Sequence, residues 1–241
     1  SIQRSTSKGA PTYDRNDTFI FNLSGQSQEL VSIGTGSDAY GPYTEYRAQI
    51  ESSFIRFRYY PVGKYGGPWR VWTKDGRRHD FTGLALHSPS GQYFYWGLTK
   101  VTDTQGNYME LSYPPVVSGR GAVRAAPTAP TYGAPAAGAP SGGGGAVSYL
   151  PEVIRYAGHE GSGMAPTHEV VFGYESRPDP LSGCRAGFNR NLLQRLISIE
   201  IKSGGTLLRR YKLRNSQNTA GFSLLTTIQL YGKDGSALPA E

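Results

Sequence analysis

One stretch of the chain, residues 96–113 (WGLTKVTDTQGNYMELSY), limits the possible folds more than any other. Its second half alternates, so that Met109, Leu111 and Tyr113 fall on one face of an extended chain and polar residues fall on the other. This period of two is typical of a half-buried strand. An apolar segment precedes it, and a polar run, residues 102–107, separates the two. The stretch is therefore predicted to be a β-hairpin.

The turn of this hairpin is predicted to depend on three residues. Asp103 can accept hydrogen bonds from backbone N–H groups two residues further on, while Gly106 and Asn107 tolerate positive φ. Apolar strands that end in Lys/Asp/Gly turns recur at 69–78 and 224–239. These repeated segments predict a sheet that is extended by the addition of hairpins.

The composition favours an all-β fold. Glycine (32), proline (16) and tyrosine (17) are plentiful in the 241 residues, and no long stretch has the apolar period of an amphipathic helix behind a capping box. We therefore expect a mostly antiparallel sheet built from successive hairpins. Strands are predicted at 19–23, 29–33, 69–73, 78–81, 153–156, 169–174, 192–202, 207–213 and 224–231, and 43–60 is predicted to be a strand pair or one bent strand. Irregular segments are predicted at 1–17, 34–42, 61–68 and 175–191.

Aromatic side chains are expected to stabilise this sheet. Trp69, Trp72, Trp96 and Tyr113 lie on predicted strands. Large rings bury much apolar area and pack edge to face. These four residues are predicted to form rows that seal the layers of the fold.

Residues 118–146 differ from the rest of the chain, because they are almost all Gly, Ala, Pro, Ser and Thr. Such a segment buries too little apolar surface to offset its ordering entropy, so we predict a disordered insertion. Sequence of the earlier β-rich style resumes directly after it. The range 1–241 is therefore predicted to be a single β-rich domain fragment, interrupted once. Its first residue is Ser1, which suggests a piece of a longer protein.

Charge and cysteine content exclude several classes of function. The net charge is +7 with a pI near 9.4, but the basic residues are scattered, so a solvated basic surface is favoured over a nucleic-acid site. Cys184 is the single cysteine, which excludes an internal disulfide and a C-x-x-C metal cluster. No apolar stretch is long enough to span a membrane. No signal peptide is recognisable at the start of the chain.

Candidate chemical motifs are weak. The four histidines lack metal-ligand spacing, and the run Asp14, Asn16, Asp17 lacks the glycine and distal glutamate of a calcium loop. We therefore predict no catalytic, cofactor-binding or metal-binding residues and no enzyme activity. The many Tyr and Trp residues, together with the basic balance, leave a carbohydrate- or cell-surface-binding β module open as an alternative.

An ordered series of segments carries a family resemblance. These segments are SIQRSTSKGAPTYDRNDTFIF, YTEYRAQIESSFIRF, WRVWTKDG, WGLTKVTDTQGN, YLPEVIRY, VVFGYESRPD and RLISIEI. The series resembles the C-terminal half of the Salmonella virulence plasmid B protein (SpvB-like) N-terminal domain, which also opens the B component of insecticidal Tc toxin complexes. The segment LTKVTDTQGNYMELSY in addition resembles a YD or Rhs repeat.

This resemblance implies a structural role. In the Tc family the B component and an Rhs-repeat component build a hollow β-sheet shell around a toxic cargo, and a propeller docks on the pore-forming component. The SpvB-like domain forms part of that shell without known catalysis. The resemblance thus implies a secreted, non-enzymatic domain, partnered by other domains or subunits of a toxin complex and lacking a cofactor. Nothing in the sequence resembles the transferase of virulence plasmid B proteins.

Overall fold

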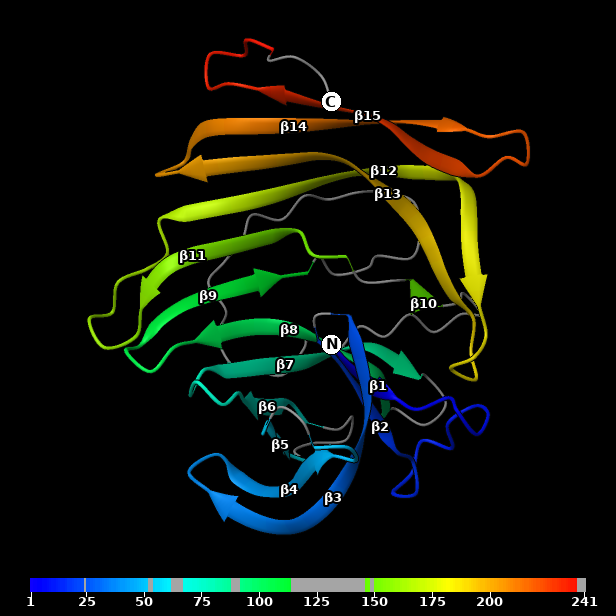
Figure 1. Ribbon diagram of the computed structural model, residues 1–241, viewed down its shortest axis with the longest axis vertical. Coiled ribbons are helices and arrows are strands. Elements are labelled where there is room, and N and C mark those ends of the chain that lie inside the picture. Colours follow the sequence, from blue (N-terminus) through cyan, green and yellow to red (C-terminus); the bar gives the residue numbers. More distant parts are fainter. Residues whose placement is uncertain are drawn as a thin grey trace.

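The fold is all-β, as predicted (Figure 1). Fifteen strands form one sheet, in which every pairing is antiparallel except that of β10 with β13, and no helix occurs within the described ranges. The computed structural model of the 241-residue chain describes residues 1–23, 25–51, 54–61, 67–87, 92–113, 146–147 and 150–237.

The strands are numbered in the order in which they follow one another along the chain. Their bounds are β1 (Ile2–Arg4), β2 (Phe19–Leu23), β3 (Gln26–Asp38), β4 (Gly41–Ala48), β5 (Arg56–Tyr59), β6 (Trp69–Trp72), β7 (Arg78–His87), β8 (Gln92–Thr102), β9 (Asn107–Ser112), β10 (Ala146–Val147), β11 (Val153–His159), β12 (His168–Gly183), β13 (Arg190–Ser203), β14 (Thr206–Gln217) and β15 (Ser223–Tyr231).

The first eight strands close into a barrel. Each of them pairs with the next, and β1 pairs with β8 as well as with β2. Ile2 therefore lies between Phe21 and Trp96. The sequence predicted an irregular segment at 1–17, and this was wrong for β1, because a strand of three residues shows no alternation that could reveal it.

Aromatic side chains fill the barrel. Trp69 and Trp96 are both 0 % exposed, with ring centroids 6.1 Å apart, and Phe19 packs edge-on against both rings. Phe21 packs in the same way against Phe57 at 4.8 Å. The interior is therefore a packed core of large rings, as is usual for a barrel with this number of strands.

An ion pair fixes the closing strand. Arg4 is 3 % exposed, and its guanidinium donates to the Asp17 carboxylate at 2.6 Å and to the Tyr93 carbonyl of β8 at 2.8 Å. Asp17 also accepts backbone N–H bonds from Thr12 and Tyr13, each at 2.8 Å. The carboxylate that the sequence offered as a calcium ligand is therefore committed to the barrel.

The sheet leaves the barrel at β8. One edge of β8 pairs with β1 at Tyr95 and Trp96 and with β9 at residues 100–102. From β9 the sheet continues through β11, β12, β13, β14 and β15 as an open extension, with β15 at its far edge (Figure 1). The molecule thus combines a closed barrel with an open sheet.

Two further predictions of irregular structure were wrong. Most of 34–42 belongs to β3 and β4, and β12 extends through 175–183. In β12 the register jumps between Ser176 and Leu181, so the residues between them bulge out of the ladder. The bulge contains two prolines, which have no N–H for a ladder bond. The predicted insertion, residues 118–146, lies outside the described residues except for Ala146, which pairs with Arg190 in β13.

Candidate assembly surface

The structure places the predicted turn residues together between β8 and β9. The Asp103 carboxylate accepts the backbone N–H groups of Gln105 and Asn107, both at 2.9 Å, and the Asn107 side-chain amide at 2.8 Å. These hydrogen bonds lower the pKa of Asp103, that of the Asn107 side chain having the largest effect. Gly106 has a φ of 91°. The turn is therefore held by the side-chain and backbone chemistry of these residues.

Substitution of Gly106 by alanine is expected to lower the free energy of unfolding by about 1–2 kcal/mol, because an L-residue is strained at positive φ. The new Cβ itself would have room, since its nearest neighbour is His159 at 3.6 Å. Urea unfolding measures the change. Gly183→Ala is the control, because its Cβ meets nothing within 4 Å and no positive φ is involved. Equal losses in both variants would contradict the argument.

The predicted aromatic rows divide between two faces. Trp69 and Trp96 lie in the barrel core, whereas Trp72 is on the outside, with Arg56 and Arg58 stacked on its ring at 4.6 and 5.3 Å. Trp69 and Trp72 could not share a face, because they are three residues apart and a strand has a period of two. Tyr113 is half-buried, donates its hydroxyl to the Leu98 carbonyl at 2.9 Å, and has its pKa raised by burial.

One face of the open sheet is apolar across its whole width. Residues that pair directly across antiparallel strands share a face. The register puts Arg209 on this face, opposite Ile201, among apolar residues that come from every strand of the open sheet: Met109, Leu111, Ile154, Val170, Phe172, Ile199, Ile201, Tyr211, Leu213, Ile228 and Leu230. We call this set the apolar face. The sequence did not predict this face. Alternation shows which residues of one strand share a side, but the register and the bulges between strands decide which sides of neighbouring strands coincide.

The apolar face continues the interior of the barrel. Met109 pairs with Val101 of β8, and Val101 pairs with His79 of β7. His79 in turn pairs with Val71, which is buried in the barrel core. The same side of one sheet is therefore core in the barrel and exposed in the extension.

The apolar face is not buried by the part of the chain that the structure describes. Its members are half-buried, and Ile228 is 40 % exposed. Leu225, on the same side of β15 by its pairing with Asn215, is 51 % exposed. Among the described residues, Val153 and Ala186 are the only buried hydrophobic residues after Trp96. The extension therefore has hydrophobic side chains but almost no core of its own.

The opposite face of the extension is charged. Arg155 pairs with Glu169 at 2.9 Å across β11 and β12. Glu200 pairs with Arg210 of β14 at 2.8 Å and with Lys202 at 3.1 Å. One face of the extension is thus apolar and the other is charged. This pattern is typical of an antiparallel sheet that packs against a second layer on one face and contacts solvent on the other.

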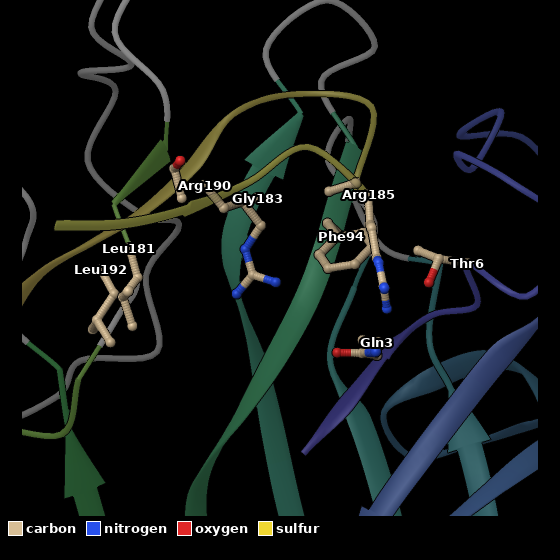
Figure 2. A pocket seen from close by; sticks show the side chains of 10 residues that line it. Gln3, Thr6, Phe94, Leu181, Gly183, Arg185, Arg190 and Leu192 are labelled. Atoms are coloured by element: carbon tan, nitrogen blue, oxygen red, sulfur yellow. The ribbon is translucent and has the colours of Figure 1, made fainter. Parts of the chain in front are cut away.

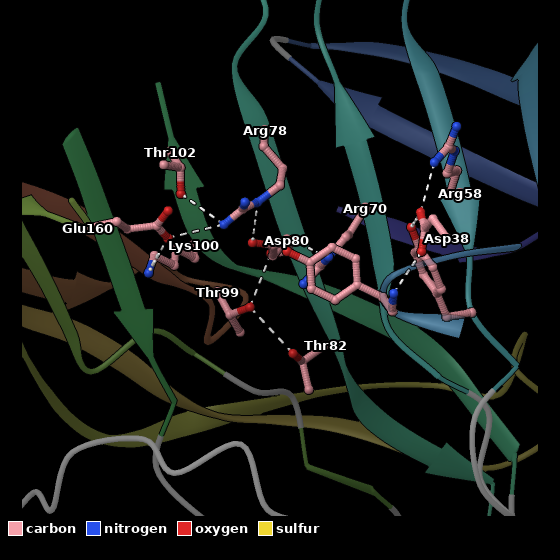
Figure 3. A network of polar contacts seen from close by, with 12 residues as sticks. Asp38, Arg58, Arg70, Arg78, Asp80, Thr82, Thr99, Lys100, Thr102 and Glu160 are labelled. Atoms are coloured by element: carbon pink, nitrogen blue, oxygen red, sulfur yellow. Dashed lines mark hydrogen bonds and ion pairs between the residues drawn. The ribbon is translucent and has the colours of Figure 1, made fainter. Parts of the chain in front are cut away.

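The charged face continues onto the outside of the barrel, where Figure 3 shows its densest network. Asp80 is bridged by Arg70 and Arg78, each at 3.0 Å. Arg78 also contacts Glu160 at 3.2 Å, and Lys100 contacts it at 2.8 Å. The Lys100 hydrogen bond is the largest influence lowering the pKa of Glu160. These charges are mutually paired and tie the loop after β11 to the barrel.

The outer edge of β15 is open except at its last residue, Tyr231, which forms an isolated bridge with Ala237. Within the described ranges β15 pairs with β14 and with no other strand of the sheet. Its first residue is fixed by Asp179, which accepts the Ser223 N–H at 2.8 Å, and by Arg195, which donates to the Ser223 hydroxyl at 2.8 Å. An edge of this kind presents unpaired backbone groups to any strand that approaches.

Neither a metal site nor a membrane-spanning helix occurs among the described residues. Across the described ranges no three His, Cys, Asp or Glu side chains are arranged so that they could hold a metal ion. The same ranges contain no helix with the length and hydrophobicity needed to cross a bilayer.

The chain is similar to a known protein family in sequence and to several solved structures in fold. Residues 1–116 match the family model described as SpvB, Salmonella virulence plasmid 65kDa B protein. No curated protein matches the chain. The N-terminal domain of the effector protein SpvB from Salmonella typhimurium strain LT2 is similar in structure, with a TM-score of 0.72 and 18 % identity over 96 % of this chain and 86 % of that domain. The likeness thus extends over most of that domain, and not only over the C-terminal half that the sequence suggested.

Two solved toxin structures are similar as well. The Photorhabdus luminescens Tc holotoxin pore matches with a TM-score of 0.73 and 18 % identity, over 99 % of this chain and 13 % of that chain. TcdB2-TccC3-Cdc42 matches with a TM-score of 0.70 and 19 % identity, over 99 % and 14 %. The chain therefore spans about an eighth of these toxin chains. The resemblance predicted from the sequence is confirmed: the first 116 residues carry the SpvB-family pattern, and the chain as a whole has the fold of the SpvB N-terminal domain.

Proposed function

We propose that the chain is a structural, non-enzymatic domain of a secreted toxin-complex or Rhs-type protein, in which its sheet forms part of a shell that encloses or delivers a toxic cargo. The observation that carries this proposal is the apolar face, which continues the barrel core over the strands from β9 to β15 and is not buried by the described residues. A sheet with one hydrophobic face is stable when a second layer covers it.

Solved structures with the same fold support a toxin complex as the assembly to which the chain belongs. The solved structures that share this fold are named as a Tc holotoxin pore and as TcdB2-TccC3, and the chain corresponds to a small part of each. The partners proposed here are accordingly other domains or subunits of such a complex, including an Rhs-repeat shell and a propeller, with a cargo protein inside. We treat 1–241 as one domain interrupted at 118–146. No cofactor, nucleic acid or membrane span is part of the proposal.

The open edge of β15 supplies the second part of the argument. A shell made of hairpins can grow by adding a strand there, since backbone hydrogen bonding does not depend on the sequence of the incoming strand. The hairpin held by Asp103, Gly106 and Asn107 is, in this proposal, one unit of such growth.

The carbohydrate-binding alternative gains no specific support. Sugars stack on exposed rings, but Trp69 and Trp96 are inside the barrel, and the Trp72 ring is occupied by two arginines. The three tryptophans therefore belong to the core or to a cation–π stack.

The proposal predicts that the isolated chain associates through the apolar face. Sedimentation velocity across a range of concentrations is expected to show reversible oligomers. Leu225→Lys and Ile228→Lys should each shift the distribution towards the monomer, because a lysine on the apolar face opposes the approach of a second apolar layer.

Leu224→Lys is the matched control. It alters the same strand and the same residue type, and Leu224 is equally exposed at 50 %, but its pairing with Ser216 puts it on the opposite face. It should leave most of the association intact. A native chain that is monomeric at every concentration, or three variants that behave alike, would contradict the proposal.

A further inference from the structure

A pocket of about 400 Å³ lies where the segment that joins β12 and β13 passes over β8 and the N-terminal residues (Figure 2). Gln3, Thr6 and Phe94 line it from the barrel side, Arg185 lines it from the joining segment, and Arg190 lines it from the start of β13. In Figure 2 both arginine side chains point towards the barrel strands, on either side of the Phe94 ring. A volume of this size is within the usual range for small-ligand sites.

The pocket is positively charged without compensation. Its lining contains two arginines and no carboxylate. The guanidinium of Arg190 lies 5.0 Å from the Phe94 ring centroid and 5.8 Å from that of Tyr95, and burial lowers the pKa of Arg190. Among the described residues no hydrogen-bond acceptor or carboxylate pairs with Arg190.

Arg190 differs from most half-buried arginines of the described residues. Most half-buried arginines elsewhere are ion-paired, for example Arg155 with Glu169, Arg195 with Glu175 and Arg210 with Glu200. Among the described residues, Arg56 is the other half-buried arginine that stacks on a ring without a carboxylate partner. A partly desolvated cation is costly unless an anion pairs with it. Arg190 is thus a half-buried cation that lines a pocket and to which the described fold supplies rings but no counter-charge.

We propose that this pocket binds a carboxylate carried on an apolar body, with Arg190 as its principal contact and Arg185 at the rim. A planar guanidinium matches a carboxylate in a two-bond geometry. Phe94, Leu181, Leu192 and Ala186 give the apolar body a surface to pack on, and Gln3, Thr6 and Ser182 add neutral hydrogen-bonding groups. The carboxylate can come from a free organic acid or from an acidic side chain of a polypeptide.

Isothermal titration calorimetry on the whole chain tests the proposal with three probes: 3-phenylpropionate, a capped Phe-Glu-Phe peptide and inorganic phosphate. At least one carboxylate should bind saturably with one site per chain. Its affinity should fall by about tenfold or more in Arg190→Gln, the loss typical of a charge-assisted hydrogen bond. Binding of the acid identifies a small-molecule source, and binding of the peptide alone identifies a polypeptide source.

Arg209→Gln is the matched control, because Arg209 is exposed on β14 and the variant loses the same single charge. Its affinity should equal that of the native chain. A measurement without any variant is the Nε–H signal of Arg190 in ¹H–¹⁵N spectra, which should shift as the bound carboxylate is titrated in. The proposal is overturned if neither carboxylate saturates, if phosphate binds in preference to both, or if Arg190→Gln binds as the native chain does.

Discussion

Replacing Trp69 by alanine is expected to lower the free energy of unfolding by about 3–5 kcal/mol, which is the usual loss for a large core aromatic. The indole is 0 % exposed and meets the rings of Phe19 and Tyr59, each at 4.9 Å, and of Tyr46 at 5.1 Å. Truncation would remove one side of each contact and leave a cavity among rigid rings that cannot collapse into it. Urea unfolding followed by circular dichroism gives the change.

Trp72→Ala is the control for this result. Trp72 is on the same strand but on the outer face, where its contacts are two stacked guanidinium groups. The loss there is expected to be about 1 kcal/mol, in keeping with cation–π pairs near the surface. If the two variants lost equal stability, the barrel interior would not be the main core of the fold.

Local structure could be predicted from the sequence because its causes are local. Alternation between Ile197 and Ile201, and the turn chemistry of Asp103 and Gly106, act over a few residues, so the strands and the hairpin could be recognised. The assignment of Trp69 and Trp72 to a common row neglected the same period of two that revealed the strands.

Closure of the barrel could not be predicted from the sequence. It depends on the pairing of Ile2 with Trp96, which lie at opposite ends of the first hundred residues, and on a strand too short to show a pattern. The apolar face was equally out of reach. Whether the apolar sides of neighbouring strands coincide depends on the register of every strand pair and on the bulges, such as the one between Arg214 and Asn215. Register depends on contacts between segments far apart in the chain, so the pattern of one strand does not show it.

The pocket around Arg190 could not be predicted from the sequence either. Arg185 and Arg190 are two of many scattered basic residues in the sequence, and nothing in their spacing distinguishes them from Arg209. What distinguishes Arg190 is burial beside Phe94, which lies almost a hundred residues earlier in the chain. A net charge of +7 therefore said little about binding, because it does not show which cations are ion-paired and which, like Arg190, are not.

Arg4→Met is expected to lower the free energy of unfolding by about 3–5 kcal/mol, the loss typical of removing one partner from a buried ion pair. Asp17 would keep its charge with a side chain only 7 % exposed, and the Tyr93 carbonyl of β8 would lose its donor. Because β1 carries Arg4 and joins β2 to β8, the variant weakens the closure of the barrel and not merely one contact. Urea unfolding measures the loss, and hydrogen exchange at Ile2 and Trp96 should quicken.

Arg155→Met tests whether burial is the reason for the large loss of stability expected in Arg4→Met. Arg155 makes an ion pair of similar length with Glu169, but at a site where the two side chains are 22 % and 31 % exposed. The loss there should stay below about 1 kcal/mol, because water stabilises the charge that remains. Adding Asp17→Asn to Arg4→Met should recover part of the stability, since it removes the uncompensated charge. Equal losses from both single variants, with no recovery in the double variant, would mean that the barrel closes through backbone pairing alone.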